Sequence, residues 1–182
     1  MHMFSSQQVI PAISNHQDLK KFLHCRATYG ILMNFQLAQL AELVGVMKEH
    51  HKKVLIHSEL IKGLSSDEFG AIYLIQVLKV DGIISSKPKV IETCKKRKVL
   101  GILRFFLKDS ISLAQSVELA QKAEPDYLEI LPATSLEIIG EIKSKVKAQI
   151  LLGGLIRSKD QIEACIKAGA KAVTSSNPSF WE

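Results

Sequence analysis

Eight short runs of β-forming residues recur along the chain, and segments with helical patterns separate them. Several runs are apolar throughout instead of alternating with polar residues, which is typical of parallel strands covered on both faces. The runs are Val9–Ala12, Ile31–Met33, Lys53–His57, Asp81–Ile84, Leu100–Arg104, Tyr127–Ile130, Ile150–Leu152 and Ala172–Ser175. Repeated β/α units of this kind form either a closed (β/α)8 barrel or an open doubly wound sheet.

The closed barrel is favoured, because no GxGxxG motif follows the first run, as an open nucleotide-binding sheet would show. We therefore predict an α/β protein, a small single-domain (β/α)8 TIM-type barrel over residues 1–182. Such barrels usually have about 250 residues, so the helices, above all the third, fourth and sixth, are expected to be short. Capping boxes predict helix starts at Ser65–Glu68, Thr134–Glu137 and Ser158–Gln161, and Gly169 suits a helix end.

Composition limits the class of protein further. With 47% hydrophobic residues the chain has ample material for a core, which excludes a disordered protein. The longest uninterrupted apolar stretch, Ile150–Ile156, has 7 residues, too few to span a bilayer. Cys25, Cys94 and Cys165 form no CxxC pair, which argues against a disulfide framework or a cysteine zinc site. We expect a cytoplasmic protein with no signal peptide, no membrane partner and no metal.

Ligands of such barrels bind at the carboxyl ends of the strands, where this sequence gathers polar residues. They are Asn34, His57, Glu59, Ser85, Ser86, Arg104, Glu129, Gly153, Gly154, Ser175 and Ser176. The loops after the seventh and eighth strands, with Gly153, Gly154, Ser175 and Ser176, resemble phosphate-binding loops, because glycine lets the backbone approach an anion. The alternative is that the glycines form a tight turn and the serines are helix caps.

The remaining polar residues have two interpretations each. His57 and Glu59, on one side of a strand, could bind polyol hydroxyls, act as an acid–base pair, or fill the barrel end as satisfied polar groups. Arg104 could neutralise a phosphate or pair with Glu129 across one intervening strand. No lysine occupies a convincing Schiff-base position, and no nucleophilic triad can be assigned.

Positive charge is concentrated in one segment. The whole chain carries +6, while residues 87–108 carry eight basic side chains and one acidic one. Lys95, Lys96, Arg97 and Lys98 fall at the turn before the fifth strand, on the face opposite the ligand site. They are candidates for RNA contacts; the alternative is that they offset helix dipoles. Few exposed aromatic residues for base stacking are evident.

The chain also resembles a known family, the glycerol uptake operon antiterminators, from about Val9 to Trp181. The segments that carry the resemblance are Ile10-Pro11-Ala12, His57 to Leu64, Asp81 to Ser86, Arg104 to Ser110, Pro125 to Pro132, Gly153 to Ile156 and Gly169 to Asn177. The sequence departs from the family pattern at Asn34, where a carboxylate is usual, and at Glu59, where Asp is usual. Leu103 and Ala133 replace Gln and Gly.

The resemblance implies a barrel that senses glycerol 3-phosphate and acts on leader mRNA to prevent early termination of transcripts for glycerol uptake and metabolism. Gly153, Gly154, Ser175 and Ser176 would then hold the phosphate, and Glu59, Arg104 and Glu129 would face the glycerol end, with Asn34 and His57 beside them. We predict a non-enzymatic regulator without a cofactor, which could form a homodimer. The alternatives are an enzyme acting on a phosphorylated polyol or triose phosphate, and a phosphate-ligand-binding paralogue without RNA affinity.

Overall fold

The eight expected strands form a closed parallel barrel in the order β1 to β8, with β8 pairing back onto β1. The computed structural model describes residues 4, 6–134 and 136–181. The strands are β1 (Val9–Ile13), β2 (Tyr29–Leu32), β3 (Lys53–His57), β4 (Gly82–Ser85), β5 (Leu100–Phe106), β6 (Tyr127–Leu131), β7 (Gln149–Gly153) and β8 (Ala172–Ser175). The predicted (β/α)8 TIM-type fold is therefore confirmed; each predicted run overlaps a strand, although Met33 and Asp81 lie just outside β2 and β4.

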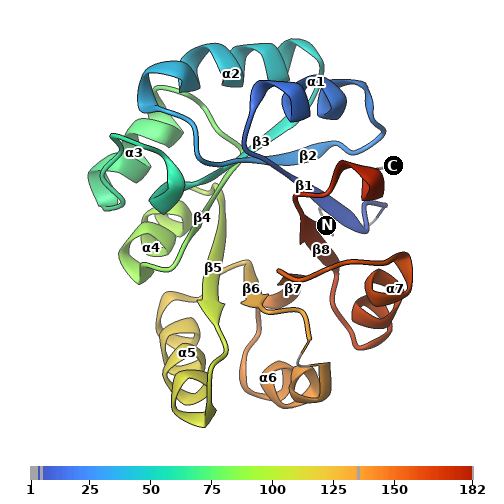
Figure 1. The fold of residues 1–182 in the computed structure, drawn as a ribbon. Coiled ribbons are helices and arrows are strands. Elements are labelled where there is room, and N and C mark those ends of the chain that lie inside the picture. Colours follow the sequence, from blue (N-terminus) through green and yellow to red (C-terminus); the bar gives the residue numbers. More distant parts are fainter. Residues whose placement is uncertain (1–3, 5, 135, 182) are drawn as a thin grey trace.

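Helices surround the barrel in chain order (Figure 1). They are α1 (His16–His24), α2 (Leu37–Glu49), α3 (Glu68–Gln76), α4 (Pro88–Lys96), α5 (Ser110–Ala123), α6 (Ile139–Lys145) and α7 (Lys159–Lys167). The third, fourth and sixth helices are short, as expected, with 9, 9 and 7 residues. In the described part of the chain β8 is followed by a 3-10 turn, Pro178–Phe180, in place of an eighth α-helix.

Three helix boundaries test the predicted capping boxes. Ser158 does cap α7, because its hydroxyl accepts a hydrogen bond from the Gln161 N–H at 3.2 Å. The prediction at Ser65 is wrong, since Asp67 caps α3 through the Gly70 N–H. The prediction at Thr134 is also wrong: a 3-10 turn, Leu136–Ile138, precedes α6, and α6 has no side-chain cap. Ser65 and Asp67 are both good cap residues, and Asp67 is the one that caps α3.

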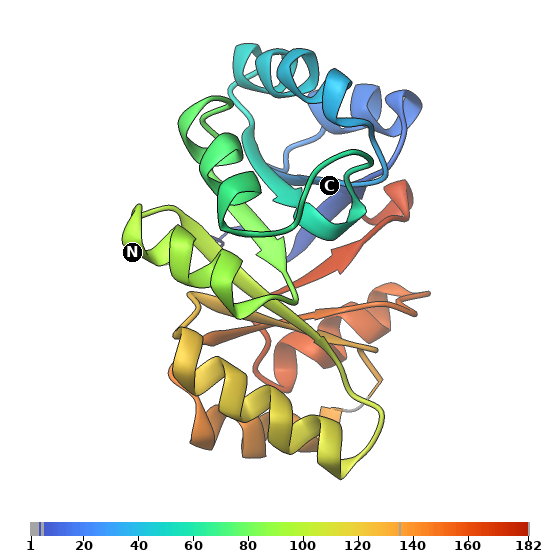
Figure 2. The ribbon, with the colours of Figure 1, turned by 90° about the vertical axis from the view of Figure 1, so that its left-hand side faces the viewer.

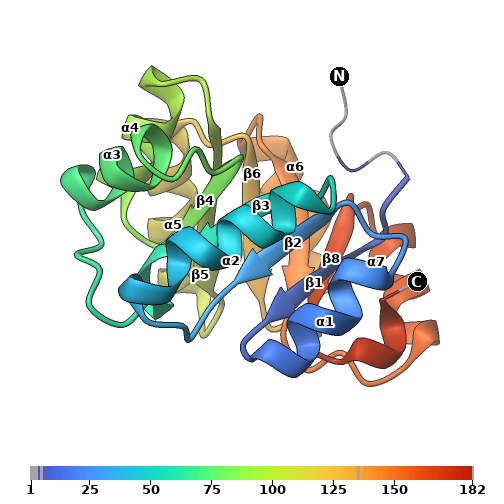
Figure 3. The same cartoon turned by 90° about the horizontal axis from the view of Figure 1, so that it is seen from above.

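The barrel interior is apolar over most of its length. Its lower part is packed by one cluster of side chains: Ile10, Ile31, Leu55, Ile84, Leu100, Ile102, Tyr127, Leu151 and Ala172. Phe4 closes the bottom, with its ring 4.9 Å from Tyr29 and 5.0 Å from Tyr127 in edge-on contacts. Two further clusters fill the layer between strands and helices, for example beneath α1 and α2 (Figure 3). The polar side chains of the barrel interior therefore lie at its other end, where the strands have their carboxyl ends. Among the described helices, none is long and apolar enough to cross a membrane.

Candidate functional site

Four polar side chains point into the barrel at its upper end, which we call the mouth: His57 on β3, Arg104 on β5, Glu129 on β6 and Thr174 on β8. Each lies two residues after a member of the interior apolar cluster. Residues two apart on a strand share a face, so these four form the layer above the apolar interior. His57, Glu129 and Thr174 are buried, and Arg104 is half-buried.

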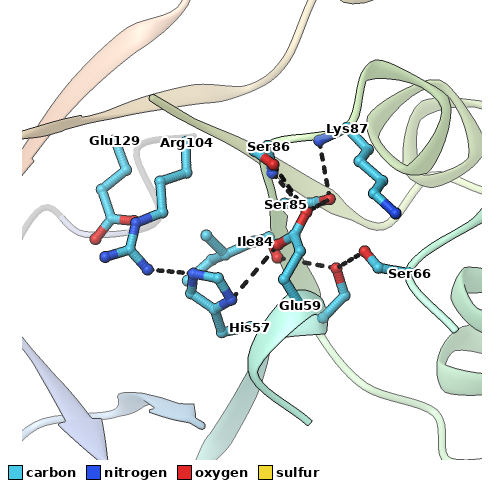
Figure 4. A network of polar contacts seen from close by, with 10 residues as sticks. His57, Glu59, Ser66, Ile84, Ser85, Ser86, Lys87, Arg104 and Glu129 are labelled. Carbon is cyan, nitrogen blue, oxygen red and sulfur yellow. Dashed lines mark hydrogen bonds and ion pairs between the residues drawn. The ribbon is translucent and has the colours of Figure 1, made fainter. Parts of the chain in front are cut away.

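The four side chains form a continuous polar network, of which Figure 4 shows His57, Arg104 and Glu129. The Arg104 guanidinium donates through Nη1 to His57 Nε2, and its Nε lies 3.5 Å from Glu129 Oε2. The Thr174 hydroxyl donates to Glu129 Oε1 at 2.6 Å. Arg104 and Glu129 are direct register partners on neighbouring strands, so the expectation that one strand separates them is wrong.

Gly153 makes room for part of this network. It ends β7, which lies between β6 and β8, so the Thr174–Glu129 hydrogen bond crosses over it. A Cβ at this position would overlap the Thr174 hydroxyl oxygen and lie 3.2 Å from Glu129 Oε1. The structure thus gives Gly153 a role in the buried network in addition to the phosphate contact predicted for it.

Glu59 lies in a 3-10 turn, Ser58–Leu60, and not on the strand itself. The shared strand side expected for His57 and Glu59 is therefore wrong, although the turn brings Glu59 Oε2 to 3.6 Å from His57 Nδ1. Glu59 Oε1 accepts hydrogen bonds from Ser85 Oγ (2.6 Å), Ser86 N (2.9 Å) and Ser86 Oγ (3.1 Å). Glu59 therefore holds the loop that leads from β4 into α4.

Burial and neighbouring charge shift the pKa values of three of these groups. Burial, followed by the positive charge of Arg104, lowers the pKa of His57 to about 4. His57 is therefore neutral at neutral pH and accepts the Arg104 N–H at Nε2, which leaves its proton on Nδ1. Burial raises the pKa of Glu129, against the opposing effects of Arg104 and Thr174. Burial alone would raise the pKa of Glu59 as well, but hydrogen bonds from Ser85 and Ser86 hold it below its usual value.

Four polar atoms of this network are buried without a hydrogen-bond partner among the described residues. They are His57 Nδ1, Glu59 Oε2, Arg104 Nε and Glu129 Oε2. They form two donor–acceptor pairs, 3.6 Å and 3.5 Å apart. A hydroxyl group both donates and accepts a hydrogen bond, so each pair could be satisfied by one hydroxyl of a ligand. Buried polar atoms are rarely left unpaired, which makes this the best-defined candidate ligand site in the described chain.

The predicted phosphate residues lie around the same mouth but differ in accessibility. Gly154 is half-buried and has a φ of +77°, a conformation that favours glycine. Ser176 is exposed. Ser175 is buried and faces away from the barrel interior: its hydroxyl accepts from the Asn177 N–H at 3.2 Å and its carbonyl from Trp181 Nε1 at 2.9 Å. Ser175 therefore supports the loop, and its contact with a phosphate remains a prediction.

Asn34 lies in the loop between β2 and α2, exposed and with a φ of +63°. Its N–H donates to the Leu60 carbonyl at 2.7 Å, so this loop contacts the 3-10 turn that carries Glu59. The structure thus brings Asn34 to the side of the mouth where the polyol end is predicted.

The predicted basic residues lie at the opposite end of the barrel, where α4 ends. Lys95 forms an ion pair with Glu124. Lys96, Arg97 and Lys98 are exposed, and no other described residue forms a side-chain hydrogen bond or ion pair with them. By contrast, Lys52 donates to the carbonyls of Cys25 and Ala27 just after α1, at 2.6 and 2.8 Å. Lys95 and Lys96 lie in the last turn of α4, where the helix-dipole alternative places them as well. Lys96, Arg97 and Lys98 are accessible to a partner, and their contact with RNA stays a prediction.

Sequence reasoning missed two contributors to the mouth. Thr174 completes the interior layer, and the Phe106 ring lies 5.3 Å from the Arg104 guanidinium carbon, in cation–π range. The signal for Thr174 was its spacing of two from Ala172. That signal is weak in a run that is buried on both faces, because such a run shows no alternation.

Fold and geometry together define a small (β/α)8 barrel with a buried polar cluster, the candidate ligand site, at the carboxyl ends of its strands. The model of the glycerol-3-phosphate responsive antiterminator family matches residues 9–181. The chain belongs to this family.

Known proteins support this assignment. The glycerol uptake operon antiterminator regulatory protein from Listeria monocytogenes is 37% identical, with a TM-score of 0.95 over 98% of this chain and 97% of that one. An antiterminator-related protein from Thermotoga maritima is 22% identical, with a TM-score of 0.84 over 95% and 96%. The uncharacterized protein YgcP of Escherichia coli is 25% identical over 100% of this chain and 95% of its own length. More distant structures, such as a deoxyribose phosphate aldolase from Aeropyrum pernix at 13% identity and TM-score 0.70, covering 98% and 88%, share the fold alone.

Proposed function

We propose that this protein senses glycerol 3-phosphate at the barrel mouth and binds leader mRNA as a transcription antiterminator for glycerol uptake and metabolism genes. The observation that carries the proposal is the set of four unpaired buried atoms on His57, Glu59, Arg104 and Glu129. They provide two donors and two acceptors, which match the two hydroxyl groups of glycerol 3-phosphate. The family to which the chain belongs supports the same effector.

The phosphate of the effector would lie against the loops after β7 and β8. Gly154 allows close approach of the backbone, and Ser176 presents an exposed hydroxyl. These two loops form phosphate sites in many barrels. Glu59, which follows β3, lies across the barrel from these loops and would repel a second anionic group, which favours a polyol over a carboxylate at that end.

Helix α4 offers a route from effector to RNA. Glu59 accepts hydrogen bonds from Ser86, the residue before the N-cap of α4, and Lys95 to Lys98 lie at the other end of this helix. An effector that hydrogen-bonds to Glu59 would change the hydrogen bonds that Glu59 makes at the start of α4. It would thereby shift the population of protein able to bind RNA, by no more than its difference in affinity for the two states.

Calorimetric titration with glycerol 3-phosphate tests the effector. We expect saturable binding that is tighter than for glycerol, for inorganic phosphate and for 3-hydroxypropyl phosphate, which lacks one hydroxyl. Sites built to hydrogen-bond a hydroxyl reject analogues that lack it, because their own buried groups stay unpaired. Equal affinity for 3-hydroxypropyl phosphate would contradict the assignment of the four atoms. Intact effector binding with a flat titration of leader RNA would instead indicate a paralogue without RNA affinity.

A second candidate function is an enzyme acting on a phosphorylated polyol or triose phosphate. The observation in its favour is the neutral His57 near a carboxyl group, Glu129, whose pKa is raised, since such pairs perform acid–base chemistry. No lysine is present among the four inward side chains of the mouth, so Schiff-base chemistry has no nucleophile there. A turnover that Glu129→Gln abolishes, while effector binding persists, would favour the enzyme.

A further inference from the structure

Helix α3 is apolar on nearly all sides. Its buried face, with Ala71, Leu74 and Ile75, packs on the core. Its outer face is also apolar: Phe69 has 74% of its surface exposed, and Ile72 is half-buried. A helix that is apolar all round is normally covered, so the outer face of α3 has the character of a binding surface.

The neighbouring helix, α4, is cationic where it faces outward. Figure 2 shows α3 and α4 side by side. A groove of about 270 Å³ runs between them, with Ile72 of α3 on one wall and Lys89, Lys96 and Arg97 of the α4 segment on the other. Glu68 and Glu92 also line it, and Glu92 forms an ion pair with Lys89 at 3.5 Å. That pair is largely exposed and therefore weak, so Lys89 can exchange it for a phosphate.

Phe69 lies on the crest of α3, three residues before Ile72, and residues three apart are neighbours on a helix surface. An exposed aromatic ring therefore lies beside a groove that carries three cations. We call Phe69, Ile72, Lys89, Lys96 and Arg97 the α3–α4 surface. An aromatic platform next to cations is the combination that single-stranded nucleic acid requires, one part for bases and the other for phosphates.

The distribution of charge separates this partner from a second copy of the chain. Residues 87–98, which include all of α4, carry six basic side chains and one acidic one, a net charge of +5. In a twofold dimer the same patch meets itself, so an interface over α3 and α4 would bring two such segments together. Like charges brought together across an interface cost several kcal/mol. A polyanion neutralises the same charges.

We propose that the α3–α4 surface binds the single-stranded part of an RNA, with a base stacked on Phe69 and the backbone following Lys89, Lys96 and Arg97. The proposal rests on the RNA binding of the proposed function and specifies where that RNA lies. It extends the basic turn Lys95 to Lys98 up the length of α4, toward the loop that Glu59 holds.

The test is a fluorescence titration of the purified protein with the transcribed leader of a glycerol-utilisation operon of the source organism, over a range of salt concentrations. Phe69→Ala should weaken RNA binding about 5- to 150-fold, the range measured for the loss of one base stack, without changing the salt dependence. Phe69→Leu keeps the apolar bulk but not the ring and should bind RNA as weakly as Phe69→Ala. Phe69→Trp keeps an aromatic ring and should bind RNA like the unaltered protein. Ile111→Ala, at an equally apolar position of α5 with 68% exposure, is the matched control and should bind normally.

The charged residues are tested through the salt slope. The double variant Lys96→Gln with Arg97→Gln should reduce the slope of log K against log salt by about 1.4, at about 0.7 per phosphate contact on a single strand. The control is the double variant Lys20→Gln with Lys167→Gln, which removes the same amount of charge at exposed positions of α1 and α7. Its salt slope should be closer to that of the unaltered protein.

The outcomes separate the two proposals. If the unaltered protein binds no leader RNA, the proposed function fails, and this inference fails with it. If the unaltered protein binds RNA and Phe69→Ala and Lys96→Gln/Arg97→Gln bind it equally well, the RNA lies elsewhere and only this inference is overturned. A dimer that Phe69→Ala dissociates, with unchanged RNA affinity, would show that a second copy covers α3.

Discussion

Adding a methyl group at Gly153 should destabilise the protein, and removing the Thr174 hydroxyl should reverse that effect. The backbone at Gly153 is not in the left-handed region, so alanine can adopt it. Its Cβ, however, would overlap Thr174 Oγ1, which donates to Glu129 at 2.6 Å. Displacing the hydroxyl leaves a buried carboxyl oxygen unpaired, at a cost of about 1–3 kcal/mol, and overpacking adds about 1–3 kcal/mol. We expect Gly153→Ala to lower the free energy of unfolding by about 2–6 kcal/mol.

The same substitution behaves differently in a Thr174→Ala background. The nearest atoms to the new methyl group are then Glu129 Oε1 at 3.2 Å, which must shift by a few tenths of an ångström, and the Cβ of residue 174 at 3.6 Å, an ordinary contact. Replacing glycine by alanine at a compatible position stabilises by about 0.4–1 kcal/mol through the unfolded chain. Gly153→Ala should therefore change the stability of Thr174→Ala by less than about 1 kcal/mol, in either direction.

Urea unfolding followed by circular dichroism measures all four corners of this cycle. Thr174→Val is the control background, because its second methyl group takes the place of the hydroxyl and keeps the overlap, so Gly153→Ala should remain costly there. The reasoning is refuted if Gly153→Ala is neutral in the unaltered protein. It is equally refuted if the substitution costs as much in the Thr174→Ala background as it does in the unaltered protein.

Three further predictions concern the mouth. The folded-state pKa of His57 is about 4, below the usual 6.5, so the free energy of unfolding falls as the pH drops from 6.5 toward 4. Between pH 7 and pH 5 this effect should cost the unaltered protein about 2 kcal/mol that His57→Gln does not lose. Urea unfolding at both pH values measures the difference. Asn34→Asp keeps a residue that tolerates the positive φ at this position. If position 34 contacts the effector, the variant should bind glycerol 3-phosphate about 10- to 150-fold more tightly, because a charged hydrogen bond contributes roughly 1.5–3 kcal/mol. An unchanged affinity by calorimetry would show that position 34 is not in the site. Gly154→Ala, at a φ of +77°, should cost about 1–2 kcal/mol of stability and weaken the effector, and normal affinity in a folded variant would contradict the phosphate assignment.

The strands could be predicted because a barrel strand is a short apolar run with helical segments on either side. The ends of the helices were harder to predict. Ser65 and Asp67 are both good caps, and only the loop geometry decides that Asp67 accepts the Gly70 N–H. The 3-10 turn that follows β8 in the described residues could not be predicted either, because Pro178 suits the first turn of an α-helix as well as that of the 3-10 turn it occupies.

The site was predicted as a set of residues but not as a network. The positions of His57, Arg104 and Glu129 follow from strand ends alone, since one barrel mouth collects them. Which atoms meet depends on which strand face each side chain occupies, and apolar runs carry no alternation to reveal this. Ser175 and Thr174 show the difference: adjacent in sequence, one supports a loop outside the barrel while the other binds Glu129 inside it.

Both proposed sites involve α4, so this helix would couple effector binding to RNA binding. Glu59 is bonded to Ser86 just before the helix begins, while Lys96 and Arg97 lie where it ends. The unpaired atom of Glu59 is Oε2, whereas Ser86 binds Oε1. An effector bound at Oε2 that turns the carboxylate would therefore also shift the Ser86 contact, and a helix of 9 residues would transmit that shift to the RNA surface as a rigid unit. Replacing Glu59 by glutamine keeps an acceptor for Ser86 but removes the charge. That variant should bind RNA with an affinity that depends less on glycerol 3-phosphate, and because coupling is reciprocal, its effector affinity should depend equally little on RNA.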